Sequence, residues 1–255
     1  MFSWQHIVWL IISFALVVFF LVSYRKKRPP FQKVLNYCLI VCYLSEFIKV
    51  FSVLEMVPSA DGSMIYPYLP QNHLPLHLCS IQILLITYVR FTENKKMRDS
   101  LLAFMYPGCL MGALSALAMP SIFSTTISVN QAFTHPMAYQ FFLYHTMLII
   151  LGFIIAWSGE IKWTWNDYFR CLIIIAVMGF VSLYVNSMFA SPTYLNGELQ
   201  HVDFWVNFLF TYQNPLGIRI TTIQGWYVYL LILCAAVAIL TFICYFPLVR
   251  KNRGN

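Results

Sequence analysis

Two histidines and one cysteine lie close together in the stretch LPQNHLPLHLCSIQ, residues 69–82. Side chains of these types support two kinds of chemistry. His73, His77 and Cys79 could bind a zinc ion, since imidazole and thiolate are its usual ligands. Alternatively, Cys79 could act as a nucleophile when a nearby histidine takes its proton. The spacing of the residues helps to separate these two hypotheses.

A helix expected within this stretch argues against a metal site. Proline suits the first position of a helix, so we expect a helix to begin at Leu74–Pro75. On that helix His77 and Cys79 would point about 200° apart. His77 is then a poor base for Cys79, and the side chains do not converge as zinc requires. We therefore expect no metal. Gln82, three residues after Cys79, would share its face and could stabilise an oxyanion.

A base for Cys79 must then come from another helix, and His145 is the best candidate. It lies about 12 Å inside a hydrophobic run, against about 6 Å for Cys79, a difference that side-chain length can bridge. A histidine would accept the thiol proton, and the thiolate would attack an ester carbonyl and pass the acyl group to an alcohol. This depth matches the ester groups of outer-leaflet phospholipids. The other six cysteines are expected to be small buried hydrophobic residues.

Membrane helices must position these residues, because 60% of the 255 residues are hydrophobic and only 10% are charged. A soluble domain carries about 25% charged residues. The first hydrophobic run lacks the flanks of a cleavable signal peptide and is expected to be retained. We predict an all-α membrane protein with one integral membrane domain, residues 1–255. It would be a bundle of seven transmembrane helices, at approximately 5–24, 33–57, 75–92, 99–119, 137–157, 169–190 and 225–248.

The basic residues predict the orientation of these helices. Of the 16 Lys and Arg residues, 14 lie in alternating segments, namely 24–33, 90–98, 158–170 and the C-terminal tail. Such segments face the cytoplasm, so we expect the N-terminus outside, the C-terminus cytoplasmic and a multi-pass protein of the cell membrane. The net charge of +7 is thus interpreted as a topology signal that also suits a contact to anionic lipids, and no nucleic-acid partner is expected.

A long outer connection, residues 191–224, precedes the last predicted helix. Its apolar core, Phe204 to Phe210, is too short to span a membrane. It is therefore interpreted as a re-entrant or interfacial segment, which is tolerated where protein buries it.

Polar residues inside the predicted spans gather toward the outer side, as do all six histidines. Glu46 and Lys49 lie three residues apart and so share one helix face. Ionisable residues in spans usually face the interior, which predicts a polar outer cavity. Its candidate residues are His77, Gln82, Glu46, Lys49, Gln140 and Asn186. The alternatives are a structural ion pair, histidines that bind headgroups or backbone carbonyls, and amides that join helices.

Three motifs resemble the YwaF-like integral membrane proteins: LPLHLC at 74–79, FFLYH at 141–145 and FWVNFLFTYQNPLG at 204–217. The resemblance covers nearly the whole chain, including its length and number of spans. That family is similar to a vertebrate family of multi-pass phospholipid acyltransferases that use a cysteine nucleophile and a histidine. The resemblance implies Cys79 as the nucleophile, His145 as its partner and membrane phospholipids as substrates.

Three functions remain open from the sequence. The first is an acyltransferase or transacylase that acts on glycerophospholipids and needs no cofactor; the acyl donor could be another phospholipid. The second is a non-enzymatic seven-helix receptor or transporter with a polar outer cavity, in which Cys79→Ala would be tolerated. The third is a lipid-binding structural subunit, which the absence of an internal pocket would favour.

Overall fold

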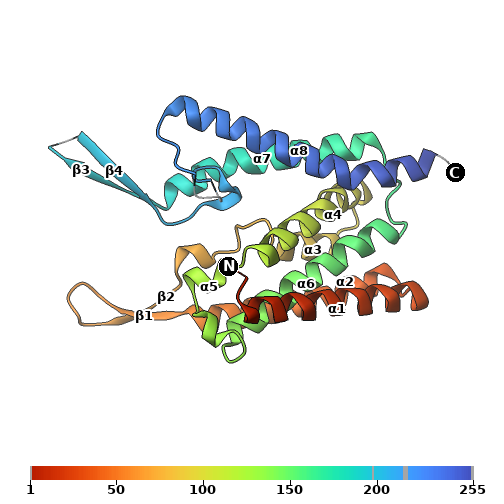
Figure 1. The fold of residues 1–255 in the computed structure, drawn as a ribbon, viewed down its shortest axis with the longest axis horizontal. Coiled ribbons are helices and arrows are strands. Elements are labelled where there is room, and N and C mark those ends of the chain that lie inside the picture. The colour runs from red at the N-terminus through yellow and green to blue at the C-terminus, as the bar shows by residue number, and fades with distance from the viewer. Residues whose placement is uncertain (1, 197, 215–217, 254–255) are drawn as a thin grey trace. The chain divides into compact units, whose positions relative to one another are not determined.

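The computed structural model describes residues 2–196, 198–214 and 218–253, most of which are helical (Figure 1). The chain divides into two compact units, Met1–Lys162 and Trp163–Asn255. Each unit is described by itself, and the single domain expected from the sequence stays a prediction.

The first unit contains helices joined by short turns and one hairpin. Its long helices are α1 (Trp4–Lys27), α2 (Phe31–Val53), α4 (Lys95–Ala118) and α6 (Pro136–Trp157). Its shorter elements are β1 (Glu55–Pro58), β2 (Ile65–Tyr68), η1 (Gln71–His73), α3 (Gln82–Phe91), α5 (Ile122–Thr125) and η2 (Val129–Gln131).

Side-chain caps define where two of these helices begin. The Asn94 side chain accepts a hydrogen bond from Met97 N at 3.1 Å, which satisfies a backbone donor that the first turn of α4 leaves free. At α6, Nδ1 of His135 accepts from Met137 N at 3.2 Å, and Pro136 occupies the first helical position. His135 is thereby engaged as a helix cap.

Helix α6 is the centre of the first unit, because it packs against α1, α2 and α4, whereas α3 packs against α2 and α4. The contact between α4 and α6 is close at Gly152. A Cβ atom there would lie 2.8 Å from Cγ of Leu110, so a larger residue would require the Leu110 side chain or the helices to shift. Small residues permit such close approach of helices in membranes.

The second unit contains two long helices, one hairpin and one short turn. They are α7 (Trp165–Met188), β3 (Ala190–Leu195), β4 (Glu198–Phe204), η3 (Phe208–Phe210) and α8 (Ile223–Arg253). Helix α7 packs against both α8 and η3.

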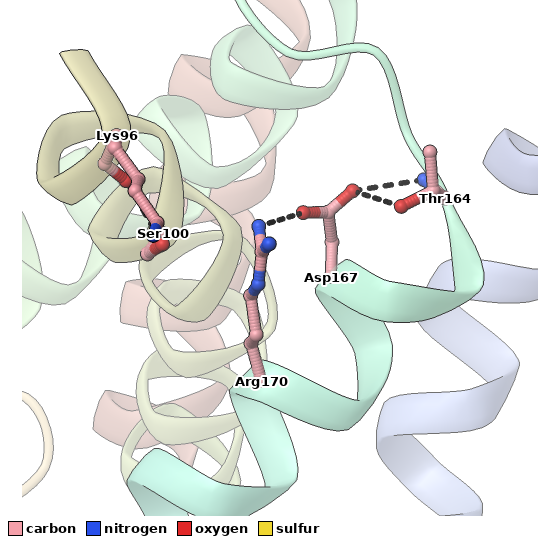
Figure 2. Close-up of polar contacts among 5 residues, drawn as sticks. All are labelled: Lys96, Ser100, Thr164, Asp167 and Arg170. Carbon is pink, nitrogen blue, oxygen red and sulfur yellow. Dashed lines mark hydrogen bonds and ion pairs between the residues drawn. The ribbon is translucent and has the colours of Figure 1, made fainter.

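The start of α7 is fixed by a capping box. Oδ2 of Asp167 accepts hydrogen bonds from Thr164 N at 2.9 Å and from Thr164 Oγ1 at 2.7 Å (Figure 2). The other carboxylate oxygen of Asp167 faces Arg170 at 3.4 Å, as the same figure shows. The carboxylate in the first turn also complements the helix dipole.

Among the described residues, six helices are long and apolar enough to cross a membrane: α1, α2, α4, α6, α7 and α8. The protein is therefore a mostly helical, multi-pass membrane protein. The third predicted span is different, because α3 has only ten residues. The prediction that this helix begins at Leu74–Pro75 is wrong, since the helix begins at Gln82 and turns precede it.

Two antiparallel hairpins were not predicted from the sequence. β1 pairs with β2, and the second predicted span accordingly ends at Val53, not at residue 57. β3 pairs with β4 inside the long connection of residues 191–224, whose apolar core forms the end of β4, a loop and η3. Residue 197 and residues 215–217, the latter at the end of the third motif, lie outside the described residues.

Candidate functional site

Cys79 lies in the turns that precede α3, in the first unit. Two side chains donate hydrogen bonds to carbonyl groups of this segment. Tyr144 of α6 donates its hydroxyl to the Cys79 carbonyl at 2.8 Å, and Nε2 of Gln82 donates to the Leu78 carbonyl at 3.2 Å. The Cys79 carbonyl also accepts a hydrogen bond from Gln82 N at 3.2 Å, which is the i→i+3 pattern of a turn. Together these bonds hold the backbone of Cys79 in place.

Helix α4 approaches this segment through two glycines. A Cβ atom on Gly112 would lie 3.0 Å from Sγ of Cys79, and one on Gly108 would lie 3.0 Å from Nε2 of Gln82. Cys109, between these glycines, directs its Sγ toward Oε1 of Gln82 at 3.4 Å. Gln82 is fully buried and bonded on both sides of its amide. Gln82 therefore links the Cys79 turn to Cys109 of α4, and it does not share a helical face with Cys79, which precedes the helix.

His145 is buried in α6 and its ring orientation is fixed by the backbone. Nδ1 of His145 lies 2.6 Å from the Phe141 carbonyl, and the Phe141 ring packs on the imidazole. Because a carbonyl can only accept, Nδ1 carries the proton and Nε2 of the neutral ring keeps a free electron pair. Among the described residues, no hydrogen bond joins His145 to Cys79. The catalytic pair stays a prediction.

Several of the predicted outer histidines bind backbone groups. Nε2 of His6 donates to the Leu117 carbonyl at 2.8 Å, and Nε2 of His77 lies 3.2 Å from the Asn72 carbonyl. His6 is buried within the first unit and does not line an open surface. These contacts match the structural alternative for individual histidines, whereas His77 and His145 also lie within electrostatic range of each other.

The ionisable pair in α2 forms as its spacing predicts. Nζ of Lys49 lies 2.8 Å from Oε1 of Glu46, and the Lys49 side chain is only 9% exposed. One turn before Lys49, Ser45 accepts a hydrogen bond from Nε2 of Gln140 in α6 at 2.7 Å. The C-terminal part of α2 therefore presents polar groups to α6, and Gln140 joins two helices as the structural alternative expected.

A polar pocket of about 260 Å³ opens beside this ion pair. It is lined by residues 52–55, Pro70, Asn72, His73 and Thr126. Burial lowers the pKa of His73, the charge of Lys49 and the proximity of His77 lower it further, and Glu46 and Glu55 oppose this effect. His73 is therefore neutral at physiological pH and can donate or accept one hydrogen bond at the pocket wall.

Asn186 belongs to the second unit and is part of a different cluster. Its Nδ2 donates to the Phe208 carbonyl at 3.1 Å and to Thr211 Oγ1 at 2.9 Å, and its Oδ1 accepts from Phe208 N at 2.8 Å. Ser182 adds a hydroxyl contact to Thr211 at 3.1 Å. This network fastens η3 to α7, so each polar group of the amide has a partner.

Metal binding has no geometric support in the part of the chain that the structure describes, since no three His, Cys, Asp or Glu side chains there are grouped to hold an ion. His73, His77 and Cys79 are among these described residues and do not form such a group.

The sequence analysis missed the residues that surround Cys79. Tyr144 lies inside the FFLYH motif, directly before the predicted base, and Gly108 and Gly112 flank Cys109 in the segment GCLMG. Two glycines spaced four apart in an apolar helix are a recognisable signal of close packing. The partner of that packing, a turn rather than a helix, had no comparable signal.

The model of the TMEM164 family matches residues 1–246, so the chain belongs to the TMEM164 family. No curated protein and no solved structure matches the chain.

Proposed function

From this membership of a membrane protein family and from the geometry around Cys79, we propose a membrane-embedded acyltransferase or transacylase that acts on glycerophospholipids. Cys79 is the nucleophile and His145 is the base. The observation that carries the proposal is the bond from Nδ1 of His145 to the Phe141 carbonyl. It fixes the imidazole in the form whose Nε2 can accept a proton, as a catalytic histidine requires.

The proposed reaction has two balanced halves. His145 takes the proton of the Cys79 thiol, and the thiolate attacks the ester carbonyl of a donor phospholipid. The ester C–O bond breaks, the lysophospholipid leaves with the proton from His145, and a thioester remains on Cys79. An acceptor alcohol then loses its proton to His145, attacks the thioester and restores the thiol. Since the Gln82 amide is already bonded on both sides, backbone N–H groups are the better candidates for stabilising the oxyanion.

Proton transfer requires Cys79 and His145 to approach each other when substrate binds, because no hydrogen bond joins them among the described residues of the free protein. Catalytic contacts are often loose in unliganded enzymes and tighten with substrate bound. The turn that bears Cys79 suits this adjustment, since its backbone is held by Tyr144 and Gln82 while the thiol itself is unbonded among the described residues.

The proposal includes a topology with seven crossings. With ten residues, α3 extends about 15 Å, which is about half of a bilayer core. We take α3 and the turns before it as an incomplete third crossing, with the irregular backbone buried in protein. The N-terminus is then outside and the C-terminus cytoplasmic, in the cell membrane, and the Cys79 turn faces the outer leaflet. The resemblance to the YwaF-like proteins also stays a prediction.

Mass spectrometry of the intact chain tests the enzyme. After incubation in nanodiscs of phosphatidylcholine, the wild-type protein should gain the mass of an acyl group, and neutral hydroxylamine should remove it. Cys79→Ser should lose the thioester, and His145→Ala should form it more slowly. Cys109→Ser is the matched control, because Cys109 is a buried thiol of the same region. An adduct of equal amount in Cys79→Ser would refute the role of Cys79.

The polar pocket favours one second candidate, a receptor or transporter without catalysis. Its lining by Glu55 and His73, next to the Glu46–Lys49 pair, suits a small polar ligand. The same pocket weighs against a purely structural lipid-binding subunit. Cys79→Ala separates the candidates, since it should abolish acyl transfer but leave ligand binding intact.

A further inference from the structure

One end of the first unit concentrates positive charge in three segments that are far apart in the sequence: residues 25–33, 90–99 and 157–162, here called the basic collar. The collar contains ten Lys and Arg residues and three carboxylates. The remainder of the first unit contains one lysine, Lys49, and three carboxylates. The unit therefore has a strongly cationic end and a weakly anionic remainder.

Side-chain contacts join the three segments into one surface. The Arg25 guanidinium lies 4.3 Å from the centre of the Trp157 ring, which links the end of α1 to the end of α6. Nη2 of Arg98 lies 2.7 Å from Oε2 of Glu160, and the same guanidinium lies 5.8 Å from the centre of the Phe31 ring. The start of α4, the start of α2 and the end of α6 thus meet at the same end of the unit.

The charge of the collar is not neutralised from within. Among the ion pairs of the described residues, only Arg98 of the collar has a carboxylate partner. The side chains of Lys26, Lys27, Lys95 and Lys96 are exposed. Several like charges close together repel one another, so an anionic partner that lies across them gains attraction from all of them.

Aromatic side chains among these cations place the collar at the level of lipid headgroups. Arg90 lies 5.2 Å from the centre of the Phe91 ring, and Lys33 lies 6.0 Å from that of Tyr37. These residues stand at the ends of apolar helices, four of which are long enough to cross a membrane. Aromatic rings and long basic side chains at helix ends are typical of the membrane interface.

We propose that the basic collar is a binding surface for anionic phospholipid headgroups of the adjoining leaflet. It is separate from the Cys79 turn, because the ten residues of α3 lie between them, about 15 Å along the helix axis. The inference therefore goes beyond the proposed acyl transfer and does not depend on it. Topology alone explains the sign of these charges, whereas bound headgroups also account for their convergence and their pairing with aromatic rings.

Native mass spectrometry of the full chain tests this surface. The protein is placed in nanodiscs of equal parts phosphatidylcholine and phosphatidylserine, released into detergent and analysed for retained lipid. The wild type should retain phosphatidylserine in clear excess. Lys26→Gln with Lys27→Gln should reduce that excess about twenty-five-fold, since each cation near an anionic surface contributes on the order of a fivefold preference. Arg250→Gln with Lys251→Gln, an equal loss of charge from exposed residues of the second unit, should leave the excess unchanged.

A second measurement on the wild type does not depend on the folding of any variant. The preference for phosphatidylserine should fall steadily as salt is added before release, because exposed charges are screened over about 8 Å at physiological ionic strength. Equal retention of the two lipids by the wild type would overturn the proposal. Equal losses in both double variants, or a preference that salt does not change, would also overturn it.

Discussion

Two buried polar clusters, one in each unit, differ in how fully their groups are bonded. In the second unit, both ends of the Asn186 amide are engaged, with three hydrogen bonds to Phe208 and Thr211. In the first unit, the thiol of Cys79 makes no hydrogen bond among the described residues, and His145 uses one ring nitrogen. Buried polar groups that are fully bonded stabilise a fold, whereas groups left with free capacity are candidates for chemistry. The difference supports a structural role for Asn186 and agrees with the reactive role proposed for the Cys79 region.

The comparison predicts its largest effect on stability at Asn186. Asn186→Ala removes three hydrogen bonds and leaves the buried N–H of Phe208 without its present acceptor. Each buried group so abandoned costs about 1–3 kcal/mol, so we expect a loss of about 3 kcal/mol in the free energy of unfolding. Thermal unfolding of the full chain in detergent measures it.

The exposed Asn166 on the same helix supplies the control, and Asn166→Ala should change stability by only a few tenths of a kcal/mol. If Asn186→Ala unfolded at the same temperature as the wild type, the network would not be structural, and the contrast between the two clusters would fail.

At Gly112 we expect a smaller effect, which concerns the rate of thioester formation rather than the stability of the fold. Gly112→Ala should gain about 1 kcal/mol from helix propensity, offset by a contact of 3.0 Å between the new Cβ and Sγ of Cys79. The thiol must move by a few tenths of an ångström, so thioester formation should slow several-fold while stability changes little. Mass spectrometry and thermal unfolding follow the two quantities.

The matched control for this substitution is Gly179→Ala in α7, since a Cβ there meets nothing within 4 Å. It should raise stability slightly and leave thioester formation unchanged. Unaltered thioester formation in Gly112→Ala would show that the close contact does not position the nucleophile.

Much of the fold was predictable from the sequence because its signals are local. The apolar runs of α1, α2, α4, α6, α7 and α8 exceed the length of a membrane span, and the Glu46–Lys49 pair follows from a spacing of three. The start of α3 was not predictable in the same way. Its apolar run begins at Leu74, but residues 74–81 form turns, and the Cys79 carbonyl accepts a hydrogen bond from Tyr144, 65 residues further along the chain. Such a tertiary contact leaves no signal in the local sequence.

The candidate site shows the same division between local and distant causes. Cys79 and His145 were selected by residue type and depth, and Gln82 by its position three residues from Cys79. Gln82 lies beside the turn, but its amide forms hydrogen bonds with Leu78 and Cys109, so its role there is structural and not oxyanion stabilisation. Asn186 was grouped with the cavity by its depth in a helix, whereas its actual partners lie in an irregular loop. Depth along a helix does not reveal which neighbour a side chain faces.

The smallest expected effect concerns the polar pocket of the first unit and the dependence of stability on pH. Burial, followed by Lys49 and His77, holds the pKa of His73 below its ordinary value of about 6.5. As the pH falls below about 6.5, the unfolded chain binds a proton before the folded chain does, so stability falls until the pH passes the pKa of the folded protein. His73→Gln should flatten this slope in unfolding experiments between about pH 5 and pH 8. The change is expected to be small, because solvent screens a half-buried side chain. An unaltered slope in His73→Gln would mean that the pocket tolerates a charged imidazole, and the polar pocket of the first unit would then resemble the fully bonded network of the second.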